Sequence, residues 1–345
     1  MLQVQSDAAP HTNASGDALL SVEHLTTVFD TPGGPVVAVD DVSFAIRRGE
    51  TLVLVGESGS GKSVAALSIL RLVQPPGRIV GGAVRFQGRD LLTLAESDMR
   101  AVRGAGISLI FQEPMSALNP VYTVGAQVAE ALTAHGLASR REAAARAVDL
   151  LRAVRIPDPD TRARDYPHQL SGGQRQRVMI AIALACRPPL VIADEPTTAL
   201  DVTIQAQILE LLGEMKSRFD LSLLLITHDF GVVAETADRV AVMYAGRIVE
   251  QGPVRAIFRS PQHPYTRGLL ASIPGIVRDQ SPGRRLHAID GTVPNLANLP
   301  PGCVFGPRCA EHGADCDRAQ PALSVVAPDQ AAACYRRGSP PRGGR

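Results

Sequence analysis

The sequence predicts an α/β fold with a parallel core sheet and crossover helices, and two patterns carry this prediction. Continuous apolar runs at residues 190–193 and 222–226 read as buried strands, and between them residues 203–219 place their apolar side chains on one helical face. Earlier in the chain, the apolar run 51–55 ends in a glycine-rich loop, and residues 62–72 continue with helical spacing. A strand, a loop and a helix in this order begin a βαβ unit.

Further elements are expected on either side of this unit. Residues 19–28 and the alternating residues 37–46 predict two strands around a Pro/Gly turn at residues 31–35, and so an N-terminal antiparallel β element. Residues 126–154 are Ala-, Arg- and Glu-rich with a helical pattern, and residues 178–185 predict a second, apolar helix. We therefore expect a helical insert between strands of the sheet.

The composition shifts near residue 252 to Pro, Gly and Arg, which predicts a domain boundary there. The expected organisation is a disordered leader at 1–17, a main domain at 18–252 with a helical subdomain at about 113–187, a C-terminal extension at 253–335 and a disordered tail at 336–345.

Bulk properties exclude several classes of protein. The net charge of +1 and the lack of a basic block argue against a nucleic-acid-binding surface. The longest apolar stretches fall short of the ~20 residues needed to cross a bilayer, and the polar N-terminus lacks the features of an export signal. We expect a cytosolic protein, in which the five Cys are reduced and serve as metal ligands or core residues.

The glycine-rich loop, Gly56-Glu-Ser-Gly-Ser-Gly-Lys-Ser63, fits the pattern G-x-x-x-x-G-K-S/T. Small residues there let backbone N–H groups surround a phosphate at the positive end of a helix. Lys62 is expected to reach the β- and γ-phosphates of a nucleotide, and Ser63 to bind Mg²⁺. The preceding buried strand and the following helix are the context that this motif requires, so the segment predicts phosphate binding.

The strand Leu190-Val-Ile-Ala-Asp-Glu195 delivers two carboxylates at its C-terminal end, where parallel sheets bind ligands. Asp194 is expected to hold the magnesium ion, and Glu195 to act as the base that polarises the attacking water. The alternative is that Glu195 is a solvated acid at the end of a strand.

The segment Leu170-Ser-Gly-Gly-Gln174 reads as a second phosphate grip, because Ser171 caps a helix and the glycines expose N–H groups. The longer run Tyr166-Pro-His-Gln-Leu-Ser-Gly-Gly-Gln-Arg-Gln-Arg177 resembles the signature motif of ABC ATPases, and the other motifs stand in that family's order. The resemblance implies a P-loop NTPase fold of the ABC type, with the main domain as the ABC ATPase domain.

The resemblance also implies roles for further residues. Gln112 resembles the Q-loop glutamine that meets the metal and the γ-phosphate, and the run ending in Ala199-Leu-Asp201 resembles the D-loop. His228 follows a buried strand as the switch histidine does, and Phe29 stands where an aromatic ring stacks on adenine, although a core position is an equal alternative. The residues expected at ATP are Phe29, Gly56, Glu57, Ser58, Gly59, Ser60, Gly61, Lys62, Ser63, Val64 and Gln112. The expected ligands of Mg²⁺ are Ser63, Gln112 and Asp194.

In the ABC family two nucleotide domains pair head to tail, so that the signature motif of one faces the ATP of the other. The signature residues here are Ser171, Gly172, Gly173 and Gln174. Each motif occurs once, so the resemblance implies pairing with a second ABC ATPase, either a different subunit or another copy of this chain. Closure on ATP and reopening after hydrolysis then drive transport.

The subtype follows from segments outside these motifs. The runs Phe111-Gln-Glu-Pro-Met-Ser-Ala-Leu-Asn-Pro-Val121 and Ser260-Pro-Gln-His-Pro-Tyr-Thr266 are similar to the first-type ATPase subunits of oligopeptide/dipeptide importers, and Val64 suits that type. The resemblance implies a peripheral protein at the cytoplasmic face of the cell membrane that energises peptide import. Its expected partners are two transmembrane permease subunits and an extracytoplasmic solute-binding protein, with no nucleic acid.

Other functions remain open from the sequence. The transporter is alternatively a related nickel or glutathione importer, since an ATPase subunit does not touch the cargo. An exporter subunit, a soluble ABC ATPase acting on nucleic acid or ribosomes, and an iron–sulfur redox sensor rank lower.

Four cysteines, Cys303, Cys309, Cys316 and Cys334, occur in a Pro/Gly-rich setting with the spacing C-x5-C-x6-C-x17-C. Four thiolates suit a [4Fe-4S] cluster or zinc, and unligated thiols are the third possibility. The spacing lacks the C-x2-C pair common at zinc sites, and the run 302–309 resembles the peptide-importer tail in which an iron–sulfur cluster is found. The cluster is therefore the leading prediction.

Overall fold

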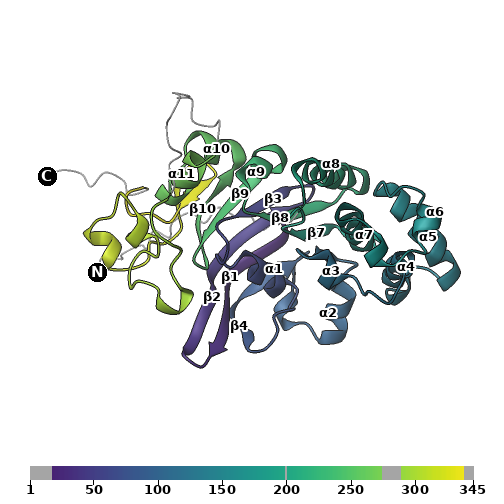
Figure 1. Ribbon diagram of the computed structural model, residues 1–345. Helices are drawn as coiled ribbons and strands as arrows, with labels where there is room; N and C mark the ends of the chain where they lie inside the picture. Colours follow the sequence, from purple (N-terminus) through teal and green to yellow (C-terminus); the bar gives the residue numbers. More distant parts are fainter. Residues whose placement is uncertain (1–17, 199, 274–288, 338–345) are drawn as a thin grey trace, which may run out of the picture.

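The computed structural model describes residues 18–198, 200–273 and 289–337 (Figure 1). Within these residues the strands form a four-stranded and an eight-stranded sheet. The smaller sheet has the order β2 (Gly34–Arg47), β1 (Ala18–Thr31), β4 (Gly77–Phe86) and β5 (Arg89–Asp90). The larger sheet has the order β11 (Ser324–Ala327), β12 (Gln330–Ala332), β10 (Arg247–Pro253), β9 (Arg239–Tyr244), β3 (Thr51–Val55), β8 (Ser222–Thr227), β7 (Leu190–Asp194) and β6 (Ile107–Ile110).

The centre of the larger sheet is parallel, as the sequence predicts. β3 pairs with β8 and β9, and β7 pairs with β8 and β6, all in parallel. β3, β7 and β8 are buried along their whole length, which explains their continuous apolar sequences. Their carboxyl ends meet at one edge of the sheet, so the loops that follow them are neighbours.

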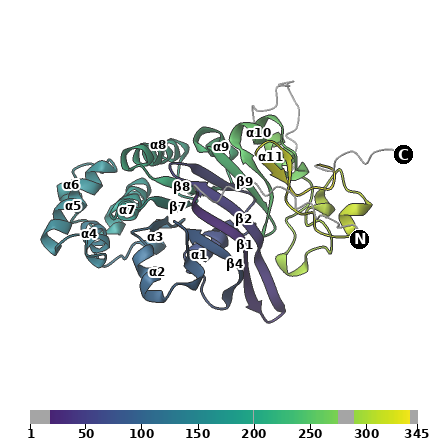
Figure 2. The ribbon, with the colours of Figure 1, turned by 180° about the vertical axis from the view of Figure 1, so that it is seen from behind.

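Helices cover both faces of this sheet (Figures 1 and 2). The helix α1 (Lys62–Ile69) packs against β1 and β2 as well as β7, and lies between the two sheets. On the other face lie α8 (Val202–Phe219) and α9 (Phe230–Thr236). The predicted helix at 62–72 ends earlier, at Ile69, and α2 (Glu96–Val102) lies beside the smaller sheet.

The N-terminal antiparallel element is confirmed. β1 and β2 pair along their length and are joined by a turn at Pro32 and Gly33. β4, which pairs with the other side of β1, was not predicted from the sequence, because it has only two buried residues, Val84 and Phe86, and so lacks an apolar run.

The helical insert extends from β6 to β7. It comprises α3 (Pro114–Ala117), α4 (Val124–Ala134), α5 (Arg140–Ala153), α6 (Pro159–Arg162) and α7 (Gly172–Leu184). The pattern at 126–154 is two helices rather than one, because Ser139 and Glu142 form a capping box that begins α5. The helix predicted at 178–185 begins earlier, at Gly172, where Ser171 caps it.

The C-terminal region continues the main sheet. β10 runs across the boundary expected near residue 252, and β12 pairs with it in antiparallel fashion. Two helices, α10 (Val254–Arg259) and α11 (Pro264–Ala271), follow β10 directly. Of the segments expected to be disordered, 1–17 and residues 338–345 of the tail 336–345 lie outside the described residues, as does Ala199. The first two residues of that tail are ordered: Arg337 donates hydrogen bonds to the carbonyl oxygen of Gln262 (3.2 Å) and to Glu311 Oε2 (3.1 Å).

A buried carboxylate fastens this region to the sheet. Glu250 of β10 is fully buried and accepts hydrogen bonds from the N–H groups of Gln262 (2.7 Å) and His263 (2.8 Å). It also accepts one from Nε2 of Gln330 (2.7 Å) in β12. Cys303, Phe305 and other residues of the C-terminal region belong to the same hydrophobic cluster as the larger sheet, so the two share one core.

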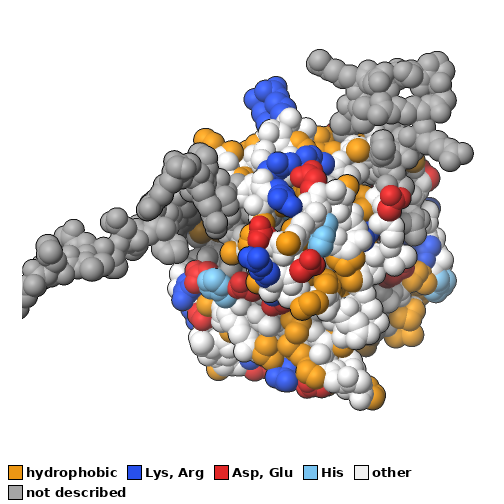
Figure 3. Space-filling view, turned by 90° about the vertical axis from the view of Figure 1, so that its left-hand side faces the viewer, with side chains coloured by type: hydrophobic (Ala, Val, Ile, Leu, Met, Phe, Trp, Pro, Cys, Tyr) orange, Lys and Arg blue, Asp and Glu red, His pale blue; other side chains and the backbone are white. Residues whose placement is uncertain are grey.

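The outer face of the C-terminal region carries interspersed acidic, basic and hydrophobic side chains (Figure 3). Across the part of the chain that the structure describes, no helix has the length and apolar character needed to cross a membrane.

The substitution Glu250→Ala is expected to destabilise the protein. It leaves buried donors without an acceptor, and since each costs about 1–3 kcal/mol, we expect the free energy of unfolding to fall by about 3 kcal/mol. Urea unfolding measures this loss, and hydrogen exchange should show faster exchange at residues 330–332. The control is Glu235→Ala, an exposed position on α9. A loss no larger than the control's would contradict the anchoring role of Glu250.

Candidate active site

The glycine-rich loop lies between β3 and α1, as its motif requires. Lys62 Nζ donates hydrogen bonds to the carbonyl oxygens of Gly56 (2.9 Å) and Glu57 (3.0 Å), which hold the ammonium over the loop. Only glycine fits at two positions: a Cβ at Gly56 would lie 2.1 Å from the carbonyl oxygen of Met243, and Gly61 has a φ of 96°. The loop is therefore shaped by the close approach of neighbouring backbone.

Lys62 is 4% exposed, and its ammonium feels the charges of three carboxylates. Burial lowers the pKa of Lys62, while the charges of Glu195, Asp194 and Glu57 act in the opposite direction. The loop therefore holds a desolvated positive charge, which suits it to an anionic ligand.

Ser63 and Asp194 come together at the end of β7. The hydroxyl of Ser63 donates a hydrogen bond to Asp194 Oδ1 (3.0 Å). Burial raises the pKa of the Asp194 carboxyl, and this hydrogen bond acts in the opposite direction. Hydroxyl and carboxylate oxygens are ligands that Mg²⁺ prefers, so the donor set fits that ion.

Glu195 is the meeting point of three loops. Its backbone has a φ of 44°, which is a strained conformation. A hydrogen bond from its N–H to the carbonyl oxygen of Ile226 (3.0 Å) stabilises this conformation. Its carboxylate accepts hydrogen bonds from Gln112 Nε2 (3.0 Å) and the Thr198 hydroxyl (2.9 Å), and His228 Nδ1 lies 3.4 Å from it. The structure thus brings together Gln112, Glu195 and His228, although Gln112 and His228 are 116 residues apart in the chain.

Thr198 is a residue that the sequence analysis missed. It stands in the run Glu195-Pro-Thr-Thr198, which offered no separate signal beyond its place in the D-loop resemblance. Its hydroxyl fixes one oxygen of Glu195, the same oxygen that Gln112 contacts. Thr198 therefore orients the carboxylate.

The signature segment lies at the beginning of α7 and faces outward. Ser171 and Gln174 form a reciprocal capping box, with hydrogen bonds of 2.9 and 3.3 Å, and Ser171 is exposed. Gly173 lies against Ile204 of α8, whose first turn is capped by Asp201. The signature segment and the D-loop are therefore neighbours, with polar groups available at the surface.

Two residues expected to contact ATP, Phe29 of β1 and Val64 of α1, are half-buried. The ring of Phe29, on β1, is half-buried and contacts Gly77 of β4, where an added Cβ would lie 2.6 Å from the ring. Val64 is half-buried and packs on the core between the sheets. Contact of either residue with ATP stays a prediction.

The four C-terminal cysteines are not in disulfides. Cys303 and Cys316 are buried, and the N–H of Cys303 donates to the carbonyl oxygen of Cys316 (2.7 Å). Burial raises the pKa of Cys303 and of Cys309 to about 11, and the charges of neighbouring thiols add to it. Over residues 18–198, 200–273 and 289–337, no three His, Cys, Asp or Glu side chains are arranged to hold a metal ion.

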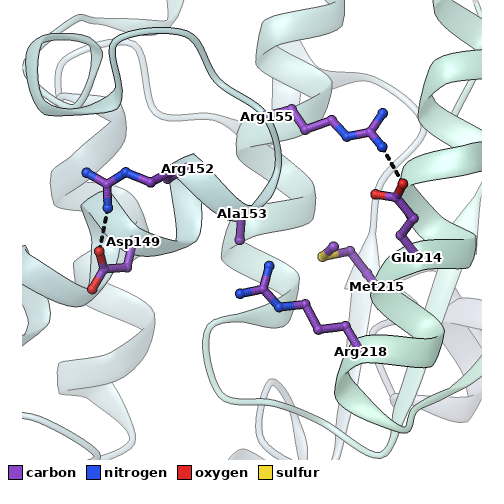
Figure 4. A pocket seen from close by; sticks show the side chains of 7 residues that line it. All are labelled: Asp149, Arg152, Ala153, Arg155, Glu214, Met215 and Arg218. Atoms are coloured by element: carbon purple, nitrogen blue, oxygen red, sulfur yellow. Dashed lines mark hydrogen bonds and ion pairs between the residues drawn. The ribbon is translucent and has the colours of Figure 1, made fainter.

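A separate pocket lies between α5 and α8 (Figure 4). Two ion pairs line it: Arg152 bonds to Asp149 (2.6 Å), and Arg155 bonds to Glu214. None of its residues belongs to the nucleotide motifs. The lining residues are Asp149, Arg152, Ala153, Arg155, Glu214, Met215 and Arg218.

Comparisons with known proteins bear on this site. The ABC transporter family model matches residues 39–198, and the model of the oligopeptide/dipeptide transporter C-terminal region matches residues 249–316. A relative from Sinorhizobium fredii, named "Probable peptide ABC transporter ATP-binding protein y4tR", is 53% identical over 94% of this chain and 97% of its own length. A Brucella abortus relative, named "Putative peptide import ATP-binding protein", is 51% identical over 93% of this chain and 98% of its own.

Solved structures share the fold. The dimeric ATP-binding cassette MJ0796, bound to ADP and phosphate, is 28% identical with a TM-score of 0.62, over 68% of this chain and 99% of that one. CbiO1 from Clostridium perfringens is 27% identical with a TM-score of 0.59, over 71% of this chain and 92% of that one.

The fold and the site thus define a P-loop ATPase of the cassette type. The chain belongs to the ATP-binding proteins of the ABC transporter family, whose ATP hydrolysis is coupled to transport.

Removing the Thr198 hydroxyl is expected to slow hydrolysis without weakening ATP binding. Hydrogen bonds to charged groups are worth about 1.5–3 kcal/mol, so Thr198→Val should lower kcat roughly tenfold or more. Thr198→Ser keeps the hydroxyl and serves as the matched control. Steady-state ATPase assays measure both constants. An unchanged kcat, or a rise in KM alone, would show that Thr198 does not orient Glu195.

Proposed function

We propose that this chain is the ATP-hydrolysing subunit of an ABC importer of peptides, acting at the cytoplasmic face of the cell membrane. The observation that carries the proposal is the match of residues 249–316 to the oligopeptide/dipeptide transporter C-terminal region, next to an ABC cassette in one chain. Relatives named for peptide transport, similar over nearly the whole length, support the same substrate class.

In the proposed reaction, ATP and water give ADP and phosphate. The loop 56–61 and Lys62 bind the β- and γ-phosphates. Ser63, Gln112 and Asp194 would hold Mg²⁺, which supplies charge neutralisation at the phosphates when bound. The desolvated ammonium of Lys62 acts more strongly on the phosphates than it would in water.

Glu195 acts on the attacking water in this proposal. Its carboxylate accepts the water's proton as the water oxygen bonds to the γ-phosphorus, while the bond from that phosphorus to the bridging β-phosphate oxygen breaks and ADP leaves. Thr198 and Gln112 fix the orientation of the carboxylate, and His228 lies beside it to contact the γ-phosphate. Because Gln112 contacts Glu195 and leads into the helical insert, it can relay the nucleotide state to that insert.

The cassette is proposed to pair with a second ABC ATPase subunit. The exposed N-terminal end of α7, with Ser171 and Gly172 at the surface, supports a role facing the ATP of a partner. The similar cassette MJ0796 is described as dimeric. Two such cassettes are expected to close on ATP and to reopen after hydrolysis.

A surface next to the Q-loop supports docking of two permease subunits. Between β6 and α4, four large apolar side chains are 44–71% exposed, which is unusual for a surface that meets only water. They are Phe111, Met115, Val121 and Tyr122. They flank Gln112 in the chain, so a bound permease would contact the segment that senses the γ-phosphate. An extracytoplasmic solute-binding protein completes the proposed importer.

The proposed domains are the ABC ATPase domain at 18–252, with its helical subdomain at 113–187, and the extension at 253–335, with tails at 1–17 and 336–345. The helices α3 to α7 fall within the proposed subdomain. A nickel or glutathione importer is the alternative within the same class, and a soluble ABC ATPase acting on nucleic acid is the alternative outside it.

We also propose that Cys303, Cys309, Cys316 and Cys334 hold a [4Fe-4S] cluster. Four unpaired thiols in one region, two of them buried, suit it. In such a cluster each thiolate binds a different iron atom, so the sulfur atoms stand farther apart than around a single zinc ion. The spacing of the four cysteines lacks the C-x2-C pair common at zinc sites, which favours the cluster over zinc.

The transport function is tested in the native membrane with Glu195→Gln. We expect the tagged chain to copurify with two multi-span permeases and a related ATPase. The variant should still bind ATP but hydrolyse it at least about 100-fold more slowly, with loss of peptide uptake. The exposed Glu235→Gln serves as the control. Ribosomal or DNA-repair partners without a permease would overturn the proposal. Uptake of nickel or glutathione instead of peptides would establish the alternative importer of the same class.

The cluster is tested by chemical analysis of protein purified without oxygen. We expect visible absorption and about four iron atoms with matching labile sulfide per chain. Cys309→Ser should lose most of the iron, and Cys186→Ser, at the cysteine outside the C-terminal region, should keep it. One zinc ion per chain, or no metal in the freshly isolated protein, would contradict the cluster.

A further inference from the structure

An arginine of the C-terminal region reaches into the glycine-rich loop. Arg308 ends a short 3-10 turn (Gly306–Arg308) and lies 251 residues from Glu57 in the chain. Its guanidinium donates to both carboxylate oxygens of Glu57, Nη1 to Oε2 at 2.8 Å and Nη2 to Oε1 at 3.1 Å. The side chain of Arg308 is 6% exposed and that of Glu57 is 29% exposed, so the guanidinium side of this bidentate pair is shielded from solvent.

The remaining donors of Arg308 are also engaged. Nε donates to the carbonyl oxygen of Asp290 (3.0 Å), and Nη2 lies 3.4 Å from that of Ile289. The guanidinium lies over the ring of Tyr244, 5.8 Å from its centroid. The hydrogen bonds to Glu57 raise the pKa of Arg308 above its usual range. The arginine is thus held in one geometry by groups from several segments.

A second residue of the C-terminal region holds the backbone at the same position. Tyr265 of α11 is fully buried, and its hydroxyl accepts a hydrogen bond from the N–H of Glu57 (3.0 Å). Its ring packs against Tyr244 and Phe305, at centroid distances of 4.6 and 5.4 Å. Both the main chain and the side chain of Glu57 are therefore fixed by residues beyond the predicted boundary.

The charge of Glu57 makes this contact matter for nucleotide binding. Glu57 is close enough to Lys62 to influence the pKa of its ammonium. An uncompensated carboxylate so close to Lys62 would repel the negatively charged phosphates that Lys62 binds. Arg308 neutralises it and at the same time fixes the loop that supplies the backbone donors.

We propose that Arg308 is a positioning residue of the ATP site, which acts through Glu57 to keep the phosphate loop in shape and its acidic side chain neutralised. The C-terminal region is then a structural part of the ATP site. This inference rests on the proposed function, since it takes the loop 56–61 as the phosphate-binding element.

The test compares ATP affinity and ATPase constants of variants of the full chain. Arg308→Ala should raise the Kd and KM for ATP about tenfold, as expected for loss of a charge-assisted pair, with kcat changed less than about twofold. Arg308→Lys keeps the charge but loses the two-pronged geometry, so its affinity should be intermediate. Arg318→Ala is the matched control, because Arg318 is 77% exposed and pairs with Asp315 on the surface.

A second substitution separates charge compensation from folding. Adding Glu57→Gln to Arg308→Ala should restore most of the lost affinity, because the repelling carboxylate is gone. If Arg308→Ala does not fold, Arg308→Gln, with a neutral side chain of similar reach, carries the same comparison. An unchanged Kd in a folded variant, or a loss that Glu57→Gln does not restore, would overturn the inference. Failure of the unaltered protein to bind ATP would instead overturn the proposed function.

Discussion

The parallel pairing of β8 with β3 and β7 is the constraint on which the rest of the site depends. It sets Val55 opposite Thr227 and Asp194 opposite Ile226, so the loops that carry the phosphate-binding segment, Glu195 and His228 leave the sheet at the same edge. These strands are buried on both faces, and their register admits no slip without moving apolar side chains out of the core. Chemistry contributed by distant parts of the chain is thereby held on a rigid frame.

The same arrangement of strands buries charged groups at the site, which costs desolvation free energy. Lys62 and Asp194 are both nearly buried, and burial shifts their pKa values in opposite directions, each toward the neutral form. Mutual attraction and hydrogen bonds only partly offset this desolvation. A ligand that brings negative phosphates to the ammonium and a cation to the carboxylate relieves it, so the nucleotide-free site is set up for a charged ligand.

The sequence predicted the elements whose signal is local. The strands β3, β7 and β8 are uninterrupted apolar runs, and the phosphate loop carries a motif between them, so both could be recognised from neighbouring residues alone. β4 and β12 could not, because β4 is mostly exposed and β12 is three residues long; pairing, not composition, makes them strands. Arg308 could not be singled out either, since its partner Glu57 is distant in the chain and neither position repeats a pattern.

The pairing of β12 with β10 also protects the protein against aggregation, because it covers the edge of β10. With β12 and β11 in place, β10 is an interior strand, and the outermost strand is the short β11 with its exposed Ser324 and Val325. A chain cut after Pro253 would open the long edge of β10 and leave Glu250 without its partners. Unpaired edges of this kind recruit strands from other molecules. The cassette and its extension therefore share one sheet, and shortening the protein to its ATPase motifs is expected to cause self-association.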